Sequence, residues 1–123
     1  MKTLWMFDVD ETLEISSGPV LLKDLVALRN QGDILGLCGN WAHVCRSILN
    51  WYDLFSIVGQ IAVPKVVHLQ QCKMYIPADR FVFVGNDHSR PRAGGYGSPN
   101  DALTAAQAGW DFINETDFAA GAR

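Results

Sequence analysis

The sequence has no long hydrophobic run. No stretch approaches the roughly 20 consecutive apolar residues that a membrane-spanning helix needs. It also lacks a positively charged N-terminal region followed by an apolar stretch and a small-residue cleavage site, which is the pattern of a secretory signal. We therefore expect a protein without a membrane partner and with a cytoplasmic location.

Cysteine and positive charge are both scarce. The three cysteines, Cys38, Cys45 and Cys72, are odd in number and form no C-x-x-C pair, so they indicate reduced thiols and not a disulfide framework. Ten Lys and Arg residues stand against thirteen Asp and Glu residues, which gives a formal net charge of −3. Because binding to a phosphate backbone needs clustered positive charge, general nucleic-acid binding is not expected.

The signatures of several common enzyme classes are also missing. No G-x-G-x-x-G follows the first apolar run, and the chain has neither a P-loop nor a G-x-S-x-G motif. Dinucleotide-binding and serine-hydrolase interpretations therefore lack their key residues. The chain does have a globular composition, with 123 residues of which 49% are hydrophobic and 19% charged. That length supports one hydrophobic core, and we predict a single domain over residues 1–123.

Short apolar runs alternate with helical patterns along the chain. The runs predict strands at residues 3–7, 33–38, 81–84 and 110–113, and a shorter one between 55 and 61. Apolar residues at helical spacing predict helices at residues 19–30, 41–52 and 64–72. Pro19 and Pro64 mark the starts of the first and third, and Gly32 follows the end of the first. A last helix follows Ser98 or Asn100 as its cap and ends at Gly109. The alternation is typical of an α/β fold with a parallel sheet covered by helices on both faces.

Three of the predicted strands end in small or polar residues. The segments are Asp8-Val9-Asp10, Cys38-Gly39-Asn40 and Gly85-Asn86-Asp87. Ligands bind such sheets in the crevice outside the carboxyl ends of the strands. We therefore expect these segments to meet at one site.

The pair Asp8 and Asp10 is the first candidate for chemistry. Two carboxylates one residue apart, directly after a buried strand, suit a reaction in which one attacks an electrophile and the other transfers a proton. Mg²⁺ would offset their repulsion, because it prefers carboxylate, water and phosphate oxygens as ligands. The alternative is a solvated turn or a helix cap.

Four segments of the chain resemble the motifs of the haloacid dehalogenase-like (HAD) phosphohydrolase superfamily, and they occur in the family's order. The segment Asp8-Val9-Asp10-Glu11-Thr12 resembles the family's first motif, D-x-D-x-T. The segment that ends in Cys38-Gly39-Asn40 resembles its second motif, in which a strand ends in Ser or Thr followed by Gly-Asn. Lys65 stands where the third motif places a basic residue, and Ser98-Pro99-Asn100-Asp101 resembles the second half of the acidic fourth motif. The resemblance covers residues 4–113 and implies a Rossmann-like α/β sandwich.

The resemblance also implies roles for these residues. Asp8 would be the nucleophile that forms an aspartyl-phosphate, and Asp10 the acid and base. Mg²⁺ would be held by the Asp8 carboxylate, the Asp10 main-chain carbonyl and a fourth-motif residue, with Asn86, Asp87 and Asp101 as the candidates. Lys65 would pair with the nucleophile and the phosphoryl group. The alternative for Lys65 is an ordinary exposed lysine on a helix.

Two positions depart from the family's pattern. Cys38 replaces a hydroxyl, and a thiol is a weaker hydrogen-bond donor, so we assign phosphate binding mainly to the backbone amides of Gly39 and Asn40 at a helix N-terminus. A small buried thiol that ends a strand is the alternative for Cys38. Asn86 stands where the family usually has Asp. Its oxygen can bind Mg²⁺ but brings no charge, so metal affinity should fall unless Asp87 or Asp101 supplies that charge.

About ten residues between Asn86 and Ser98 form an apparent insertion in the fourth motif. The insertion contains four groups able to bind an anion or stack on a ring, namely His88, Arg90, Arg92 and Tyr96. Its ends adjoin candidate metal ligands, so we predict that it shapes the mouth of the site. A solvated surface loop is the alternative.

No gap between the motifs is long enough for a cap domain. The sequence therefore predicts a small capless Mg²⁺-dependent phosphatase that hydrolyses a phosphomonoester through phospho-Asp8. One alternative is a binding or regulatory protein that keeps the fold and turns over poorly. Another is a phosphatase for a phosphate on a nucleic acid or a protein. Capless members of the family use a large substrate or a second subunit to cover the site. The sequence therefore allows a homo-oligomer as well as a monomer.

Overall fold

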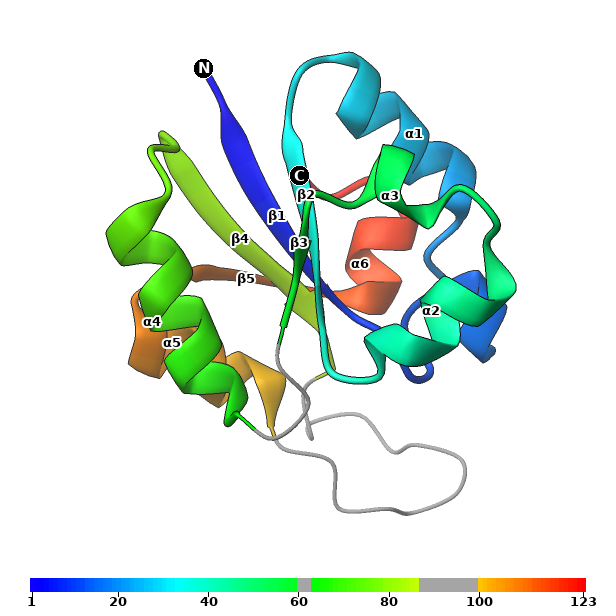
Figure 1. Ribbon diagram of the computed structural model, residues 1–123. Helices are drawn as coiled ribbons and strands as arrows, with labels where there is room; N and C mark the ends of the chain where they lie inside the picture. Colours follow the sequence, from blue (N-terminus) through cyan, green and yellow to red (C-terminus); the bar gives the residue numbers. More distant parts are fainter. Residues whose placement is uncertain (60–62, 87–99) are drawn as a thin grey trace.

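The computed structural model describes residues 1–59, 63–86 and 100–123, and its centre is a sheet of five parallel strands (Figure 1). The strands are β1 (Thr3–Asp8), β2 (Ile34–Cys38), β3 (Ile57–Val58), β4 (Arg80–Gly85) and β5 (Asp111–Asn114), arranged in the order β3-β2-β1-β4-β5. The predicted α/β fold with a parallel sheet is confirmed, and its architecture is compatible with a Rossmann-like fold. The strand order reverses between β1 and β4, which is where ligands bind in such sheets.

Helices cover both faces of the sheet (Figure 1). One face carries α1 (Leu22–Asn30), α2 (Trp41–Ser47), α3 (Trp51–Leu54) and α6 (Glu115–Ala119), and the other carries α4 (Lys65–Tyr75) and α5 (Asp101–Ala108). Side chains alternate between the faces along a strand. Trp5 and Phe7 of β1 accordingly pack in the core with α1, whereas Leu4 and Met6 pack in the core with α4.

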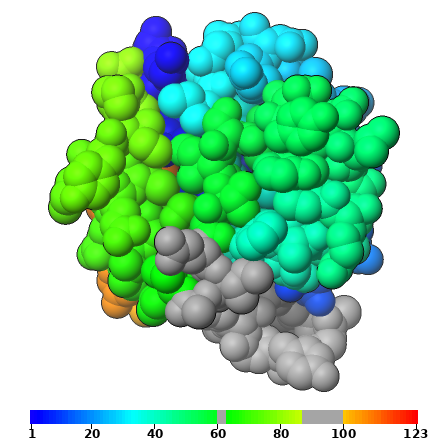
Figure 2. Space-filling model, viewed as in Figure 1, coloured from blue at the N-terminus to red at the C-terminus, as the bar shows by residue number. Residues whose placement is uncertain are grey.

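The central strand is covered on both sides. All six residues of β1 are buried, which explains why it appears in the sequence as a continuous apolar run. Figure 2 shows α4 on one side and the layer that contains α1 and α2 on the other. Asp8, the last residue of β1, is 6% exposed although it is ionisable.

The first helix begins later than the sequence predicts. Helix α1 starts at Leu22, and the predicted start at residue 19 is wrong. Val20 forms a parallel bridge with Leu13, and its N–H donates to the carbonyl of Thr12 at 2.9 Å. The side chain of Glu14 then accepts a hydrogen bond from the N–H of Leu22 at 2.7 Å. The chain therefore returns in an extended conformation before it turns into the helix.

The helix predicted over residues 41–52 is two short helices, α2 and α3. Ile48 has an extended backbone, with φ −119° and ψ 113°, and ends α2. Regular helical spacing would put Leu49 on one face with Val44 and Ile48, but Leu49 is 90% exposed. Asn50, a residue that favours caps over helix interiors, precedes α3. The core contacts of this region come from Val44, Ile48 and Trp51, which follow one another at helical spacing. The spacing therefore predicts one continuous helix and does not indicate the break at Ile48.

The remaining helices differ less from the expected ones. Helix α4 continues to Tyr75, three residues beyond the predicted end, and the predicted caps of α5 are confirmed. Asn100 accepts a hydrogen bond from the N–H of Leu103, and Gly109 ends the helix with a φ of 76°. Helix α6 was not predicted. A 3₁₀ turn, Glu14–Ser16, completes the regular structure of the described residues.

A membrane-spanning helix is absent from the described residues. None of the helices found there is both long enough and apolar enough to cross a bilayer.

Candidate active site

The carboxylate of Asp8 lies at the centre of the site, at the carboxyl end of β1. One oxygen, Oδ1, accepts a hydrogen bond from Nζ of Lys65 at 2.9 Å. The other, Oδ2, accepts from Nδ2 of Asn86 at 3.0 Å and from Oγ1 of Thr12 at 3.3 Å. These partners come from α4, the end of β4 and the turn after β1. Both oxygens of a single buried carboxylate are therefore held in fixed directions.

The ammonium group of Lys65 connects two carboxylates. Lys65 is the first residue of α4, and its Nζ lies 2.9 Å from Oδ1 of Asp8 and 3.0 Å from Oδ1 of Asp101. Burial alone would lower the pKa of Lys65, but the charges of Asp8 and Asp101 outweigh it and hold the pKa above its ordinary value. Lys65 is therefore positively charged at neutral pH. The alternative of an ordinary exposed lysine does not fit this geometry.

Asp101 is tied to the end of β4 as well as to Lys65. It is the first residue of α5 and is fully buried, and its Oδ2 accepts a hydrogen bond from the backbone N–H of Asn86 at 3.1 Å. The backbone N–H of Asp101 donates to the carbonyl of Asn86 at 3.0 Å. A Cβ at Gly85 would lie 2.5 Å from Oδ2 of Asp101, so only glycine permits this approach. Both oxygens of Asp101 are engaged.

Burial dominates the electrostatics of Asp8. Removal from water raises the pKa of Asp8, the ammonium of Lys65 counters part of this effect, and the nearby charge of Asp101 adds to the rise. The network places two carboxylates against one ammonium. An additional positive charge, from a cation or a proton, would be favourable there.

Asp10 lies two residues beyond Asp8, on the exposed side of the site. Its Oδ1 accepts a hydrogen bond from Nδ2 of Asn40 at 3.2 Å, which connects the loop after β1 with the loop after β2. Glu11 has a φ of 57°, in the left-handed region. The N–H of Thr12 then donates to the carbonyl of Val9 at 3.1 Å. This turn brings Thr12 back to Asp8 and leaves Asp10 at the surface.

The loop after β2 passes close to Asp8. Gly39 has a φ of 102°, and a Cβ there would lie 3.1 Å from Oδ1 of Asp8, so glycine suits both the backbone and the space. Cys38 is 2% exposed, and burial raises the pKa of its thiol to about 12. The thiol is neutral at pH 7, which agrees with the interpretation as a small buried residue. Asn40 precedes α2, a helix of only seven residues.

The structure brings most of the predicted site residues together and adds one. Asp8, Asp10, Cys38, Gly39, Asn40, Lys65, Asn86 and Asp101 surround one end of the sheet. The contact of Thr12 with Asp8 was not foreseen, although its place four residues after Asp8 was a usable signal. The predicted residues Asp87, His88, Arg90, Arg92 and Tyr96 lie outside the described residues, and their roles stay predictions.

The donors near Asp8 suit Mg²⁺ but form a sparse site. Among the described residues, no three His, Cys, Asp or Glu side chains are placed to hold a metal ion together. The oxygen donors at the site are the Asp8 carboxylate and the side-chain carbonyl of Asn86, whose amide group lies against Oδ2 of Asp8. The resemblance would add the main-chain carbonyl of Asp10. Mg²⁺ accepts such a set, since it commonly binds one or two carboxylates and completes its shell with water and substrate phosphate. The chemistry of these donors is compatible with the ion that the resemblance implies.

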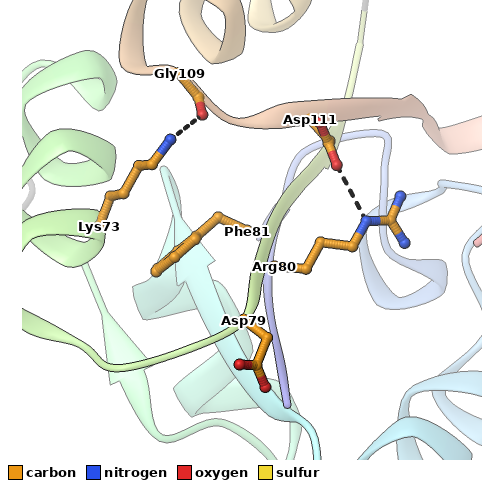
Figure 3. A pocket seen from close by; sticks show the side chains of 6 residues that line it. All are labelled: Lys73, Asp79, Arg80, Phe81, Gly109 and Asp111. Atoms are coloured by element: carbon orange, nitrogen blue, oxygen red, sulfur yellow. Dashed lines mark hydrogen bonds and ion pairs between the residues drawn. The ribbon is translucent and has the colours of Figure 1, made fainter. Parts of the chain in front are cut away.

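A hollow of about 260 Å³ lies at the opposite end of the sheet, where β4 and β5 begin (Figure 3). Its lining residues are Lys73, Asp79, Arg80, Phe81, Gly109 and Asp111. Lys73 donates to the carbonyl of Gly109, and Nε of Arg80 lies 3.1 Å from Oδ2 of Asp111. Its lysine and carboxylate side chains are exposed, whereas Asp8 and Asp101 are buried, so this hollow is a weaker candidate than the Asp8 end.

Comparison with known proteins adds no relative to this description. A scan of protein-family models found no match, and searches of curated proteins and of solved structures found no significant similarity. The fold and the site define a class by themselves: a small α/β protein with a parallel sheet. A lysine-bridged pair of buried carboxylates lies at the point where its strand order reverses.

Proposed function

We propose that this protein is a Mg²⁺-dependent phosphomonoesterase of the HAD-like type, with Asp8 as its nucleophile. The observation that carries the proposal is the buried Asp8 carboxylate, which lies 2.9 Å from the charged Lys65 and is followed two residues later by the exposed Asp10. A nucleophile held next to a cation, with a second carboxyl group close by, is what phosphoryl transfer requires.

In the first step, a carboxylate oxygen of Asp8 attacks the phosphorus atom of the ester. The new bond joins Asp8 to phosphorus, and the bond from phosphorus to the ester oxygen breaks. The carboxyl group of Asp10 gives its proton to the departing oxygen, so that an alcohol leaves. Asn40 holds the Asp10 side chain in place for this transfer through its bond to Oδ1.

In the second step, water releases the phosphate. The Asp10 carboxylate takes a proton from the water as the water oxygen attacks phosphorus, and the bond between Asp8 and phosphorus breaks. The products are inorganic phosphate and free Asp8. Asp10 ends the cycle protonated, as it began.

The other residues orient the reactants and balance charge. Lys65 neutralises negative charge that builds up on the phosphoryl oxygens, and Asp101 positions Lys65 through the contact at 3.0 Å. Asp8, Asn86 and the carbonyl of Asp10 would hold Mg²⁺, which when bound supplies a further positive charge against the phosphoryl oxygens. Gly39 keeps a side chain away from the nucleophile, because a Cβ there would lie 3.1 Å from Oδ1 of Asp8.

Hydrolysis of p-nitrophenyl phosphate and of a panel of phosphomonoesters tests this function. The native protein should turn over with Mg²⁺ and stop with EDTA, and Asp8→Asn should abolish turnover. Asp53→Asn is the matched control, because Asp53 is exposed on α3, away from the site. Asp53→Asn should keep native activity. A native rate unchanged by Asp8→Asn would rule the proposal out.

A folded native protein without turnover would instead favour a binding or regulatory role. Asn86 is the observation behind that alternative, because an amide in place of an acidic metal ligand lowers the charge available to a cation. A phosphate on a nucleic acid or a protein would then be tested next as a ligand and as a substrate.

A further inference from the structure

Asn86 is held by its backbone and is almost fully buried. Its N–H donates to Oδ2 of Asp101 at 3.1 Å, its carbonyl accepts from the N–H of Asp101 at 3.0 Å, and the residue is 1% exposed. The preceding Gly85 allows Asp101 to approach this closely. The main chain of Asn86 therefore stays in place, and the side-chain amide is the part that can turn.

The chemistry of Asp8 sets the orientation of that amide. Oδ2 of Asp8 is a carboxylate oxygen and can only accept hydrogen bonds, so the amide atom 3.0 Å away is the NH₂ group. An aspartate at position 86 would instead place a negative oxygen against Oδ2. Two carboxylate oxygens at that separation are stable only with a cation or a proton between them. The amide thus occupies a place where a carboxylate would need a partner.

We propose that Asn86 takes the place of the cation at Asp8 whenever the metal is absent. Its NH₂ group satisfies Oδ2 in the metal-free protein, and the amide turns to offer its carbonyl oxygen when Mg²⁺ binds. The site is therefore assembled without metal, and Mg²⁺ binds weakly because it must displace a charge-assisted hydrogen bond. The statement that the NH₂ group of Asn86 satisfies Oδ2 rests on the contacts of Asn86 alone. The statement that the amide turns toward Mg²⁺ rests on the proposed function.

Asn86→Asp tests this inference without any substrate. We expect the unfolding temperature of the native protein to be nearly the same in EDTA and in millimolar Mg²⁺. The unfolding temperature of Asn86→Asp should fall in EDTA and recover in Mg²⁺, and calorimetric titration should show Mg²⁺ binding at least about tenfold tighter than native. Asn50→Asp is the matched control, because it adds the same charge at an exposed residue before α3 and should behave like the native protein.

The side-chain amide signals of Asn86 in ¹⁵N-labelled native protein give a second readout. We expect them to move on addition of Mg²⁺ while the backbone amide signal of Asn86, bonded to Asp101, moves less. An Asn86→Asp protein with the same Mg²⁺ response as native would overturn the inference. If that variant folds in neither buffer, side-chain signals of the native protein that do not move with Mg²⁺ would overturn it.

These measurements separate the inference from the proposed function. Binding, unfolding and amide signals do not depend on turnover, so a protein that hydrolyses nothing can still pass them. Conversely, hydrolysis that depends on Asp8, together with an Asn86→Asp variant that responds to Mg²⁺ as the native protein does, would overturn the inference and leave the phosphatase intact.

Discussion

Gly39 is the residue whose backbone lets the loop after β2 pass next to Asp8. Gly39→Ala would place a methyl group 3.1 Å from Oδ1 of Asp8 and would strain a backbone with a φ of 102°. We expect a stability loss of about 1–3 kcal/mol from the strain. We also expect kcat/KM to fall about tenfold to a hundredfold, because the nucleophile is displaced. Urea unfolding and aryl-phosphate hydrolysis measure the two effects.

Gly32→Ala separates the two effects. Gly32 has a similar φ of 98°, but no atom lies within 4 Å of the Cβ that a side chain would add. The stability of Gly32→Ala should fall by a similar amount while its kcat/KM per folded protein stays native. Equal losses of activity in the two variants would show that Gly39 acts only through its backbone.

The ionised carboxylate of Asp8 should lower the free energy of unfolding of the protein. Burial raises the pKa of Asp8, so the ionised carboxylate is less favourable in the folded than in the unfolded chain. This penalty is absent below the ordinary pKa of 3.8, where both states are protonated, and it is complete above the raised folded-state pKa. Asp8→Asn should therefore raise the unfolding temperature by a few degrees at pH 7, and the gain should shrink toward pH 4.

Thermal unfolding of Asp8→Asn and of native protein across this pH range checks the sign. In the variant, Lys65 keeps Asp101 as its partner, so the ammonium is not left unpaired. Asp53→Asn removes an exposed carboxylate and should give no such pH-dependent gain. A destabilised Asp8→Asn at pH 7 would mean that the contact with Lys65 outweighs burial.

The sequence predicts which residues meet at the site better than it predicts how they pair. Asp8, Gly39 and Asn86 are expected at one sheet edge because strand ends converge there. The motif resemblance, and not the strand pattern, places Lys65 and Asp101 with them. The resemblance predicts the pairing of Lys65 with Asp8, but nothing in the sequence predicts that Lys65 also contacts Asp101, which is far from both along the chain. Such pairing depends on where α4 and α5 begin relative to β1, and no local pattern encodes that.

At the scale of elements, strands were easier to predict than helices. β1 and β4 are buried on both faces and appear as apolar runs, so their positions were found within one or two residues. The sequence does not predict helix α6, because its five residues contain one large apolar side chain, Phe118, and show no helical periodicity. Its start signal was present in Asn114, whose side chain accepts a hydrogen bond from the N–H of Thr116.

Helix α6 should nevertheless matter for stability. Phe118 is fully buried, and its ring makes edge contacts with Trp5 at 5.7 Å and with Phe7 at 5.5 Å between centroids. Phe118→Ala should lower the free energy of unfolding by about 3–5 kcal/mol. Leu103→Ala, at a site 55% exposed, should change it by less than about 0.5 kcal/mol. A small loss at Phe118 would mean that α6 is dispensable for the core.

For the whole molecule, the sheet order and the net charge both bear on the substrate. The order β3-β2-β1-β4-β5 gathers the ends of three strands around Asp8, while the net charge of −3 gives no long-range attraction for an anion. The kcat/KM for a small phosphomonoester should therefore change less than about twofold between about 50 and about 200 mM salt. A steep fall for a terminally phosphorylated oligonucleotide would favour a nucleic-acid substrate instead.

The most direct test of the account is to trap the phosphorylated enzyme. Native protein mixed with substrate and Mg²⁺ would be quenched within one turnover and reduced with borohydride, which converts an aspartyl-phosphate to homoserine. Mass spectrometry of the N-terminal peptides would then locate the modified residue. We expect homoserine at position 8 only, and none in Asp8→Asn. Turnover with no modification at Asp8, or with modification at another residue, would contradict the assignment of Asp8 as the nucleophile.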